Sequence, residues 1–148
     1  MRMIDRPIRP LFPDGFIDEV QIQCWTMSHD GQNDTDVIAC TGGSAALMLT
    51  DAPFQGPVAT VRVGRILTDD GPQFVINPTH AQMEYTDLDL VLSGHSDGVN
   101  MIEVGAAEVS EQAVLEAIKF GYEHGCKPIL EMQIELMEKA YGVMNYGN

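Results

Sequence analysis

A strictly alternating stretch at residues 87–93 is the feature that most restricts the fold of this chain. Leucines occupy positions 88, 90 and 92, and Asp87, Asp89 and Val91 lie between them. Side chains of a β-strand point to opposite faces at successive residues, so this pattern is typical of a strand with one buried face. Residues 94–98 contain two glycines and predict a turn, and residues 99–104 predict the returning strand.

Two further segments have strand character. Residues 58–67 and 73–76 predict a second hairpin, closed by Asp69-Asp70-Gly71. Residues 19–28 also predict a strand, because apolar or small side chains alternate there with glutamines and Trp25.

Helices are predicted in two regions. Residues 37–49 are small and apolar, which favours a helix packed closely on a sheet although its glycines lower the helix propensity. Ser110 is a suitable N-cap for a second helix, whose core stripe would be Val114, Leu115, Ile118 and Tyr122. Pro128 should kink or interrupt that helix before a further helical stretch over residues 129–141.

The order of these elements predicts the α+β class, with a mixed sheet and helices packed on one side. Residues 2–108 would form a sheet-rich core, and residues 109–145 would form a C-terminal helical segment. Residues 2–6 resemble the last turn of a helix that Pro7 ends. Because a protein seldom begins with the end of a helix, we expect earlier residues to precede this sequence.

Charge argues against a generally nucleic-acid-binding surface. The chain of 148 residues has 22 acidic and 8 basic residues, for a formal net charge of −14. Three of the basic residues, Arg2, Arg6 and Arg9, nevertheless fall within the first nine positions. Because screening limits the influence of distant charges, a local basic edge on an acidic body can still hold an anion.

Other compositional features favour a cytoplasmic protein with no membrane association. No apolar run is long enough to span a bilayer, and the first residues lack the apolar region of a secretory signal. The three cysteines, Cys24, Cys40 and Cys126, have no metal-like spacing and are expected to be free thiols in a reducing compartment.

Several ordered blocks of sequence resemble one enzyme family, the polyribonucleotide nucleotidyltransferases. The blocks are Arg2-Met-Ile-Asp-Arg-Pro-Ile-Arg-Pro-Leu-Phe-Pro, Ser44-Ala-Ala-Leu, Pro53-Phe-Gln-Gly-Pro, Val61-Arg-Val-Gly-Arg, Phe74-Val-Ile-Asn-Pro-Thr, Asp87-Leu-Asp-Leu-Val and Glu116-Ala-Ile-Lys-Phe-Gly. They resemble the first RNase PH-like core of that family, and residues 1–148 would be a partial copy of this domain that lacks its first strands. The resemblance implies a fold like ribosomal protein S5 domain 2, assembled into rings.

The family's activity is phosphate-dependent 3′-to-5′ degradation of RNA, which belongs to mRNA catabolism. The resemblance implies inorganic phosphate as co-substrate and magnesium as cofactor, both acting in a second RNase PH-like core that would be the partner of this one.

Where that core has serines for phosphate, this chain has Asp34-Thr35-Asp36. Two carboxylates at a helix N-terminus would repel phosphate, and we interpret them as helix caps. Asp89 matches a catalytic aspartate, but we interpret it as a solvated strand-face residue. The chain alone is therefore expected to have no catalytic or metal-binding residues.

The family's arginines in the first of these blocks line the RNA path, which implies an RNA-binding role for Arg2, Arg6 and Arg9. A guanidinium offers forked donors that suit phosphate oxygens. The structural alternative is that one arginine pairs with Asp5 and that Arg9 anchors the proline-rich turn, and for Arg9 this alternative is favoured. Arg62 and Arg65 are explained adequately by ordinary ion pairs.

Three readings remain open at this point. The chain would be the non-catalytic part of a phosphorolytic exoribonuclease, which contributes RNA contacts and ring assembly as a homo-oligomer, such as a trimeric ring. It would otherwise be an independent RNase PH-like scaffold, or an incomplete fragment whose sheet edge is uncovered.

Overall fold

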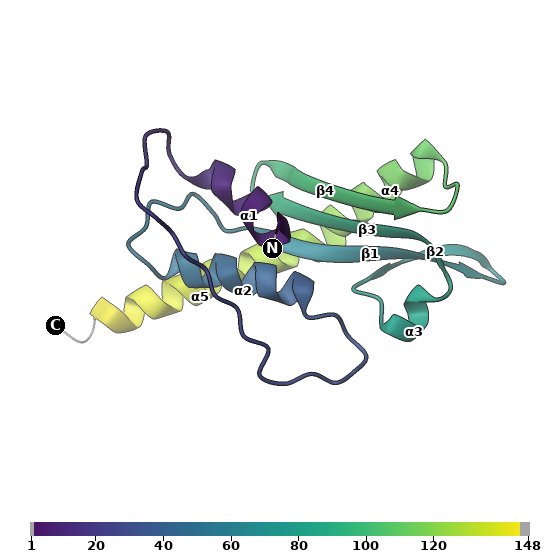
Figure 1. Cartoon of the computed structure of the whole chain (residues 1–148), viewed down its shortest axis with the longest axis horizontal. Helices are drawn as coiled ribbons and strands as arrows, with labels where there is room; N and C mark the ends of the chain where they lie inside the picture. Colours follow the sequence, from purple (N-terminus) through teal and green to yellow (C-terminus); the bar gives the residue numbers. More distant parts are fainter. Residues whose placement is uncertain (1, 146–148) are drawn as a thin grey trace.

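The computed structural model describes residues 2–145 and consists of a four-stranded sheet with helices on both faces (Figure 1). The elements in chain order are α1 (Arg2–Ile8), the 3₁₀ turn η1 (Arg9–Leu11), α2 (Asp36–Met48), β1 (Ala59–Thr68), β2 (Gly71–Ile76), α3 (His80–Met83), β3 (Thr86–His95), β4 (Gly98–Ala106), α4 (Glu111–Gly121), the π-helical turn η2 (Tyr122–Cys126) and α5 (Lys127–Asn145). Within residues 2–145, no helix combines the length and the apolarity needed to cross a membrane.

The sheet has the strand order β2-β1-β3-β4, and every pairing in it is antiparallel. Both predicted hairpins are confirmed, with Thr68 paired to Gly71 in the first and His95 paired to Gly98 in the second. The α+β class is confirmed, but the sheet is not mixed as expected. Turns this short can join only antiparallel strands, because a parallel neighbour needs a long crossover.

The main core lies between the sheet and the helical segment α4–η2–α5. Leu88, Leu90 and Leu92 of β3 are buried there, as their alternation predicted. From the helical side Ala117, Cys126 and Leu130 are buried against them. Ser110 caps α4 as predicted by accepting a hydrogen bond from the backbone N–H of Ala113 at 3.3 Å. Within the predicted stripe of α4, however, Leu115 is exposed.

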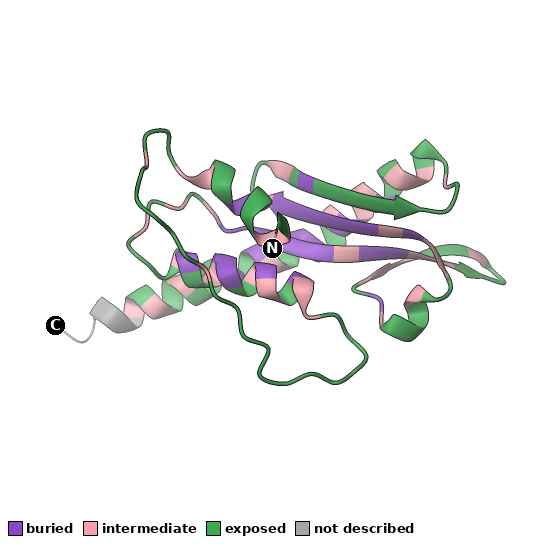
Figure 2. Ribbon diagram, in the orientation of Figure 1, coloured by how far each residue is buried: buried purple, intermediate pink, exposed green. Residues whose placement is uncertain are grey.

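Helices α1 and α2 cover the opposite face of the sheet, so the prediction of helices on one side is wrong (Figures 1 and 2). Val91 and Met101 alternate away from the leucine face and are buried with Val37 of α2, and Met3 of α1 packs on this group. The second face can be covered because α2 is rich in small residues. Its buried Ser44 accepts a hydrogen bond from the N–H of Val58 at 2.8 Å.

The strand predicted at residues 19–28 is absent, and this segment instead crosses α2 as coil (Figure 1). Ile22 is the point of contact, because a Cβ added to Gly43 of α2 would lie 3.3 Å from Ile22 Cγ2. A strand requires a neighbouring strand to pair with its backbone. Within residues 2–145, none of the four strands lies beside this segment.

Of the two prolines expected to affect helices, only Pro128 acts as predicted. Pro128 is preceded by the π-helical turn η2, which confirms the predicted interruption. Pro7 does not end α1 at Arg6, because the helix continues to Ile8. Pro7 and Ile8 are buried, and the Pro7 carbonyl accepts a hydrogen bond from Asn100 Nδ2 of β4 at 3.0 Å. These tertiary contacts outweigh the preference of Arg6, as the residue before a proline, for a non-helical backbone.

A close helix–sheet approach at Gly121 gives the first testable prediction. A Cβ on Gly121 would overlap Leu92 Cδ2 and would lie 2.6 Å from Val63 Cγ2. We therefore expect Gly121→Ala to lower the free energy of unfolding by about 1–3 kcal/mol through overpacking. The matched control is Gly142→Ala, since a Cβ there would meet no described atom within 4 Å. Thermal or urea denaturation should find the control neutral or slightly stabilised; equal effects in both variants would contradict the packing described.

Candidate functional site

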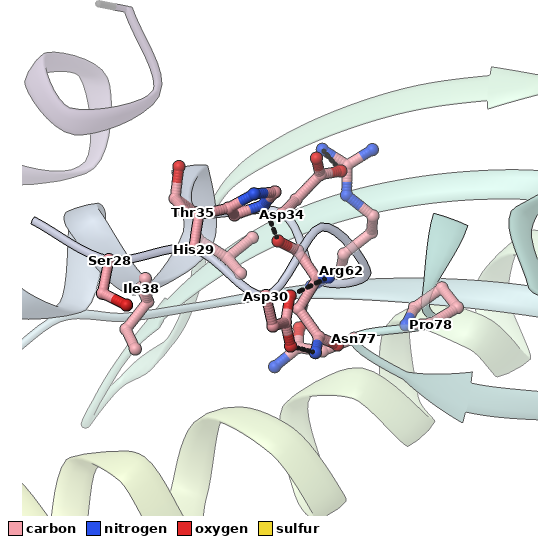
Figure 3. Close-up of a pocket in the computed structure, with 11 residues that line it drawn as sticks. Ser28, His29, Asp30, Asp34, Thr35, Ile38, Arg62, Asn77 and Pro78 are labelled. Carbon is pink, nitrogen blue, oxygen red and sulfur yellow. Dashed lines mark hydrogen bonds and ion pairs between the residues drawn. The ribbon is translucent and has the colours of Figure 1, made fainter. Parts of the chain in front are cut away.

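A cavity of about 350 Å³ opens where the loop before α2 meets β1 and the residues after β2 (Figure 3). Residues 28–30 and 33–35 form one side of the cavity, and Val37 and Ile38 continue this side into α2. Arg62 of β1 lines the other side, together with Asn77 and Pro78. Asn77 is fixed against β1, because its Oδ1 accepts a hydrogen bond from the Arg62 N–H at 2.9 Å and its own N–H donates to the Arg62 carbonyl at 2.7 Å.

The guanidinium of Arg62 is the centre of charge in this cavity. It pairs with Asp36 at 2.5 Å, with Asp89 at 2.9 Å and with Asp34 at 3.6 Å. The arginine side chain is only 14% exposed. Burial opposes its charge, but the nearby carboxylates of Asp89, Asp36 and Asp34 outweigh this effect and raise the pKa of Arg62. The expectation of ion pairs at Arg62 is confirmed, as is that for Arg65, which lies 3.5 Å from Asp87.

The N-terminus of α2 is thereby closed to anions. Asp36 Oδ1 accepts a hydrogen bond from the N–H of Val37 at 2.7 Å, while its second oxygen pairs with Arg62. The N-cap of α2 is Thr35, whose side chain makes no capping hydrogen bond, so the interpretation of the two aspartates as N-caps is wrong. Asp36 is the first residue of the helix and accepts only from the adjacent Val37, whereas Asp34 contacts Arg62 and lies 3.7 Å from His80 Nε2. One guanidinium faces three carboxylates, so the group has excess negative charge and does not suit phosphate.

The same ion cluster does not fit a magnesium ion. The oxygens that would coordinate the metal are occupied by Arg62, whose positive charge would repel a cation. Asp89 is also not the freely solvated residue that was expected, because both of its carboxylate oxygens accept hydrogen bonds from Arg62 Nη1. Across residues 2–145, no group of three or more histidine, cysteine, aspartate or glutamate side chains is arranged to hold a metal.

The loop beside the cavity, residues 29–33, is stabilised by hydrogen bonds among its own residues. The Asp30 carboxylate accepts hydrogen bonds from the backbone N–H groups of Asn33 and Gln32 and from the Asn33 side chain. These bonds stabilise the charged form and lower the pKa of Asp30 to about 2. His29 bridges the loop, since its ring contacts the Gly31 N–H and the Asn33 carbonyl. The sequence predicts a polar loop from Asp30-Gly31 through Asp36, but it does not predict these hydrogen bonds.

The predicted RNA-binding arginines lie elsewhere, on α1 and η1. Arg2 and Arg6 are one helical turn apart and exposed, and neither makes an ion pair within residues 2–145. Arg9 is also exposed but pairs with Asp5 at 2.6 Å. Its hydrogen bond and electrostatic attraction to Asp5 raise the pKa of Arg9. Arg9 thus has the ion-pair partner that its structural role requires, which is Asp5. Arg2 and Arg6 have no such partner among the described residues, and their charges are not neutralised.

The Arg62 cluster gives a second prediction. We expect Arg62→Gln to lower the free energy of unfolding by about 2–3 kcal/mol, because three partly buried carboxylates lose their common partner. Chemical denaturation measures this change. The additional substitution Asp36→Asn should restore part of the loss, since it removes one of the repelling charges.

Arg9→Gln is the matched control for that experiment, because it also breaks an arginine–aspartate pair but at the exposed surface. We expect it to leave the stability essentially unchanged. A stability loss in Arg9→Gln equal to that in Arg62→Gln would contradict the central role given to Arg62.

Comparison with known proteins places this geometry in context. Models of the 3′ exoribonuclease family match twice, with domain 1 over residues 1–53 and domain 2 over residues 56–124. The chain is 50% identical to the polyribonucleotide nucleotidyltransferase of Geotalea daltonii over 139 residues, which are 94% of this chain and 19% of that protein. It is 50% identical to the enzyme of the same name from a Sulfurihydrogenibium species over 141 residues, 95% of this chain and 19% of that protein. The chain thus spans about a fifth of the length of these relatives.

Among solved structures, rice Rrp46 superposes with a TM-score of 0.54 at 14% sequence identity. The superposition covers 73% of this chain and 47% of that chain. At this identity the similarity concerns the fold alone, and it supports the RNase PH-like architecture predicted from the sequence.

Proposed function

Because the chain belongs to the 3′ exoribonuclease family, we propose that it serves a phosphate-dependent 3′-to-5′ exoribonuclease by contributing RNA contacts and subunit interfaces. The relatives named polyribonucleotide nucleotidyltransferase support this activity for the whole enzyme. The proposal treats the chain as part of the first RNase PH-like domain, with inorganic phosphate and magnesium acting in a partner core. It also includes assembly as a homo-oligomeric ring trimer and a cytoplasmic location, with which three free thiols agree.

The proposal rests on one observation, which is that Arg62 is paired with carboxylates whereas Arg2 and Arg6 are not. Arg62 is partly buried and surrounded by three carboxylates, so its charge is already neutralised and does not favour an anion. Arg2 and Arg6 point their charge to solvent from the same side of α1. In a chain with a net charge of −14, such an exposed pair is the place where an RNA backbone meets the least repulsion.

The same observation argues against catalysis by this chain alone. Phosphorolysis requires an anionic nucleophile to be held beside an anionic substrate, which calls for cationic groups and free donors around the reacting atoms. The α2 N-terminus has the right kind of backbone donors, but Asp36 already accepts from the Val37 N–H. We therefore assign no catalytic residue here and place the chemistry in the partner core.

A scaffold that keeps the fold without any RNA contact is the second candidate. It is favoured by the excess of acidic residues and by the absence of a fitting phosphate or metal site among residues 2–145. The two candidates differ in one respect that can be measured, which is whether Arg2 and Arg6 contact RNA phosphates.

RNA binding by arginine variants tests this difference. We expect the double substitution Arg2→Ala and Arg6→Ala to weaken binding of single-stranded RNA. The binding partner of the RNA is either the chain itself or its complex with a protein that carries the second RNase PH-like core. Each lost phosphate contact should reduce the slope of log affinity against log salt by about 0.7, or about 1.4 for both. Fluorescence anisotropy over a salt series measures both quantities.

Arg9→Ala serves as the control, because Asp5 already neutralises Arg9 and its loss should change the slope less. If the double variant kept both the affinity and the salt slope of the unaltered chain, the RNA-contacting role would be excluded and the scaffold would remain.

A further inference from the structure

Asn100 is the extra residue of a β-bulge in β4. Val99 pairs with Gly94 of β3, and Met101 pairs with Ser93. Asn100 lies between these two pairs, and none of the described residues of β3 is its partner. A bulge turns a side chain away from the regular alternation of its strand, and bulges are frequent next to functional sites. The Asn100 side chain can therefore take a direction that a regular strand does not allow.

The bulge directs Asn100 to the face of the sheet that α1 covers. In a regular strand, Asn100 would share a face with Ile102, whose partner Leu92 points into the main core. Instead, Asn100 Nδ2 donates a hydrogen bond of 3.0 Å to the Pro7 carbonyl of α1. The next residue, Met101, is buried on the same face as α1 and α2. Two consecutive residues of β4 thus serve this one face.

The Pro7 carbonyl needs a donor from outside its helix. It is among the last four carbonyls of α1, and such carbonyls have no partner within the helix. Pro7 is fully buried, which limits the access of water to this oxygen. A buried carbonyl without a donor costs free energy, so the hydrogen bond from Asn100 stabilises the end of α1 against β4.

The same hydrogen bond helps to set the orientation of α1. Pro7 and Met3 are one helical turn apart and face inward, since Pro7 is buried and Met3 packs on the second core. Arg2 and Arg6 precede them and are exposed. Pro7 has no N–H, so it cannot donate to the Met3 carbonyl within the helix. Contacts with the sheet, including the Asn100 hydrogen bond, therefore decide more of the direction in which the two arginines point.

We propose that Asn100 is a positioning residue for RNA, which holds α1 so that Arg2 and Arg6 contact the RNA backbone together. The inference rests on the proposed function, because Asn100 has this role only if the two arginines contact RNA. Asn100 acts through α1 and does not contact the RNA itself. Its loss leaves both positive charges in the chain but releases the helix that directs them.

RNA binding by Asn100→Leu tests the proposal. Leucine has the branched shape of asparagine but no donor for the Pro7 carbonyl. We expect the dissociation constant for a fluorescently labelled oligoadenylate, measured by anisotropy, to rise by about threefold to tenfold, as for the loss of one hydrogen bond. The slope of log affinity against log salt should fall toward that of the Arg2→Ala, Arg6→Ala variant. Asn100→Gln keeps an amide donor and should restore part of the affinity.

Tyr122→Phe is the matched control. The Tyr122 hydroxyl donates to the His95 carbonyl at 2.9 Å, so this variant also removes a side-chain donor to a backbone carbonyl at the β3–β4 hairpin. The donor comes from η2 rather than from the bulge that faces α1. Urea denaturation should find both variants less stable than the unaltered chain, whereas RNA affinity should fall in Asn100→Leu alone. Unchanged affinity in Asn100→Leu, or an equal loss in both variants, would overturn the proposal.

A double-mutant cycle separates positioning from direct contact. In a chain that carries Arg2→Ala and Arg6→Ala, Asn100→Leu should cause no further loss of RNA affinity, because the side chains that Asn100 positions are gone. A further loss as large as in the unaltered chain would overturn the proposal. The cycle also distinguishes the two failures. If the arginine substitutions have no effect, the RNA-contacting role itself is refuted; if they weaken binding and Asn100→Leu does not, only the positioning role is refuted.

Discussion

One arginine joins the parts of this molecule that lie far apart in the sequence. Arg62 projects from β1 and pairs with Asp89 of β3, with Asp36 at the start of α2 and with Asp34 in the preceding loop. Without the guanidinium, three carboxylates would face one another at the junction of the sheet and α2, with only partial access to water. The pairing fixes the start of α2 against the sheet and so places Val37 in the second core with Val91 and Met101. Helix α1 then packs on α2 and on β4.

The same pairing decides where an anion can bind. A helix N-terminus on a sheet is ordinarily suited to phosphate, but here the first turn of α2 supplies its own carboxylate, and both terminal nitrogens of the nearest arginine, Arg62, pair with carboxylates. The exposed positive charge that remains near this end of the molecule is on α1, at Arg2 and Arg6. This distribution is why RNA contact and assembly, rather than bond cleavage, are the roles proposed for the chain.

Local patterns in the sequence were sufficient to predict much of the fold. Period-two alternation located β3 and its leucine face, short polar turns located both hairpins, and Ser110 located the start of α4. The errors arose where the outcome depends on residues distant in the chain. Residues 19–28 have the alternation of a strand but no strand beside them. Helix α2 covers the second face of the sheet, which could not be predicted because its sequence is only weakly amphipathic. Ion pairs of Arg62 were expected, but its three acidic partners are recognised only when β1, β3 and α2 meet; the roles of Arg2, Arg6 and Arg9 stay predictions.

Phosphorolysis is the measurement that tests the account most directly. The purified chain is incubated with end-labelled RNA, magnesium and inorganic phosphate, and released nucleoside diphosphates are separated from the RNA. The account predicts no diphosphate from the chain alone, and diphosphate when a second-core protein that is inactive by itself is added. Diphosphate released by the chain alone would show that the cluster around Arg62, Asp36 and Asp89 forms a working site, and would contradict the central claim that this cluster is closed to phosphate.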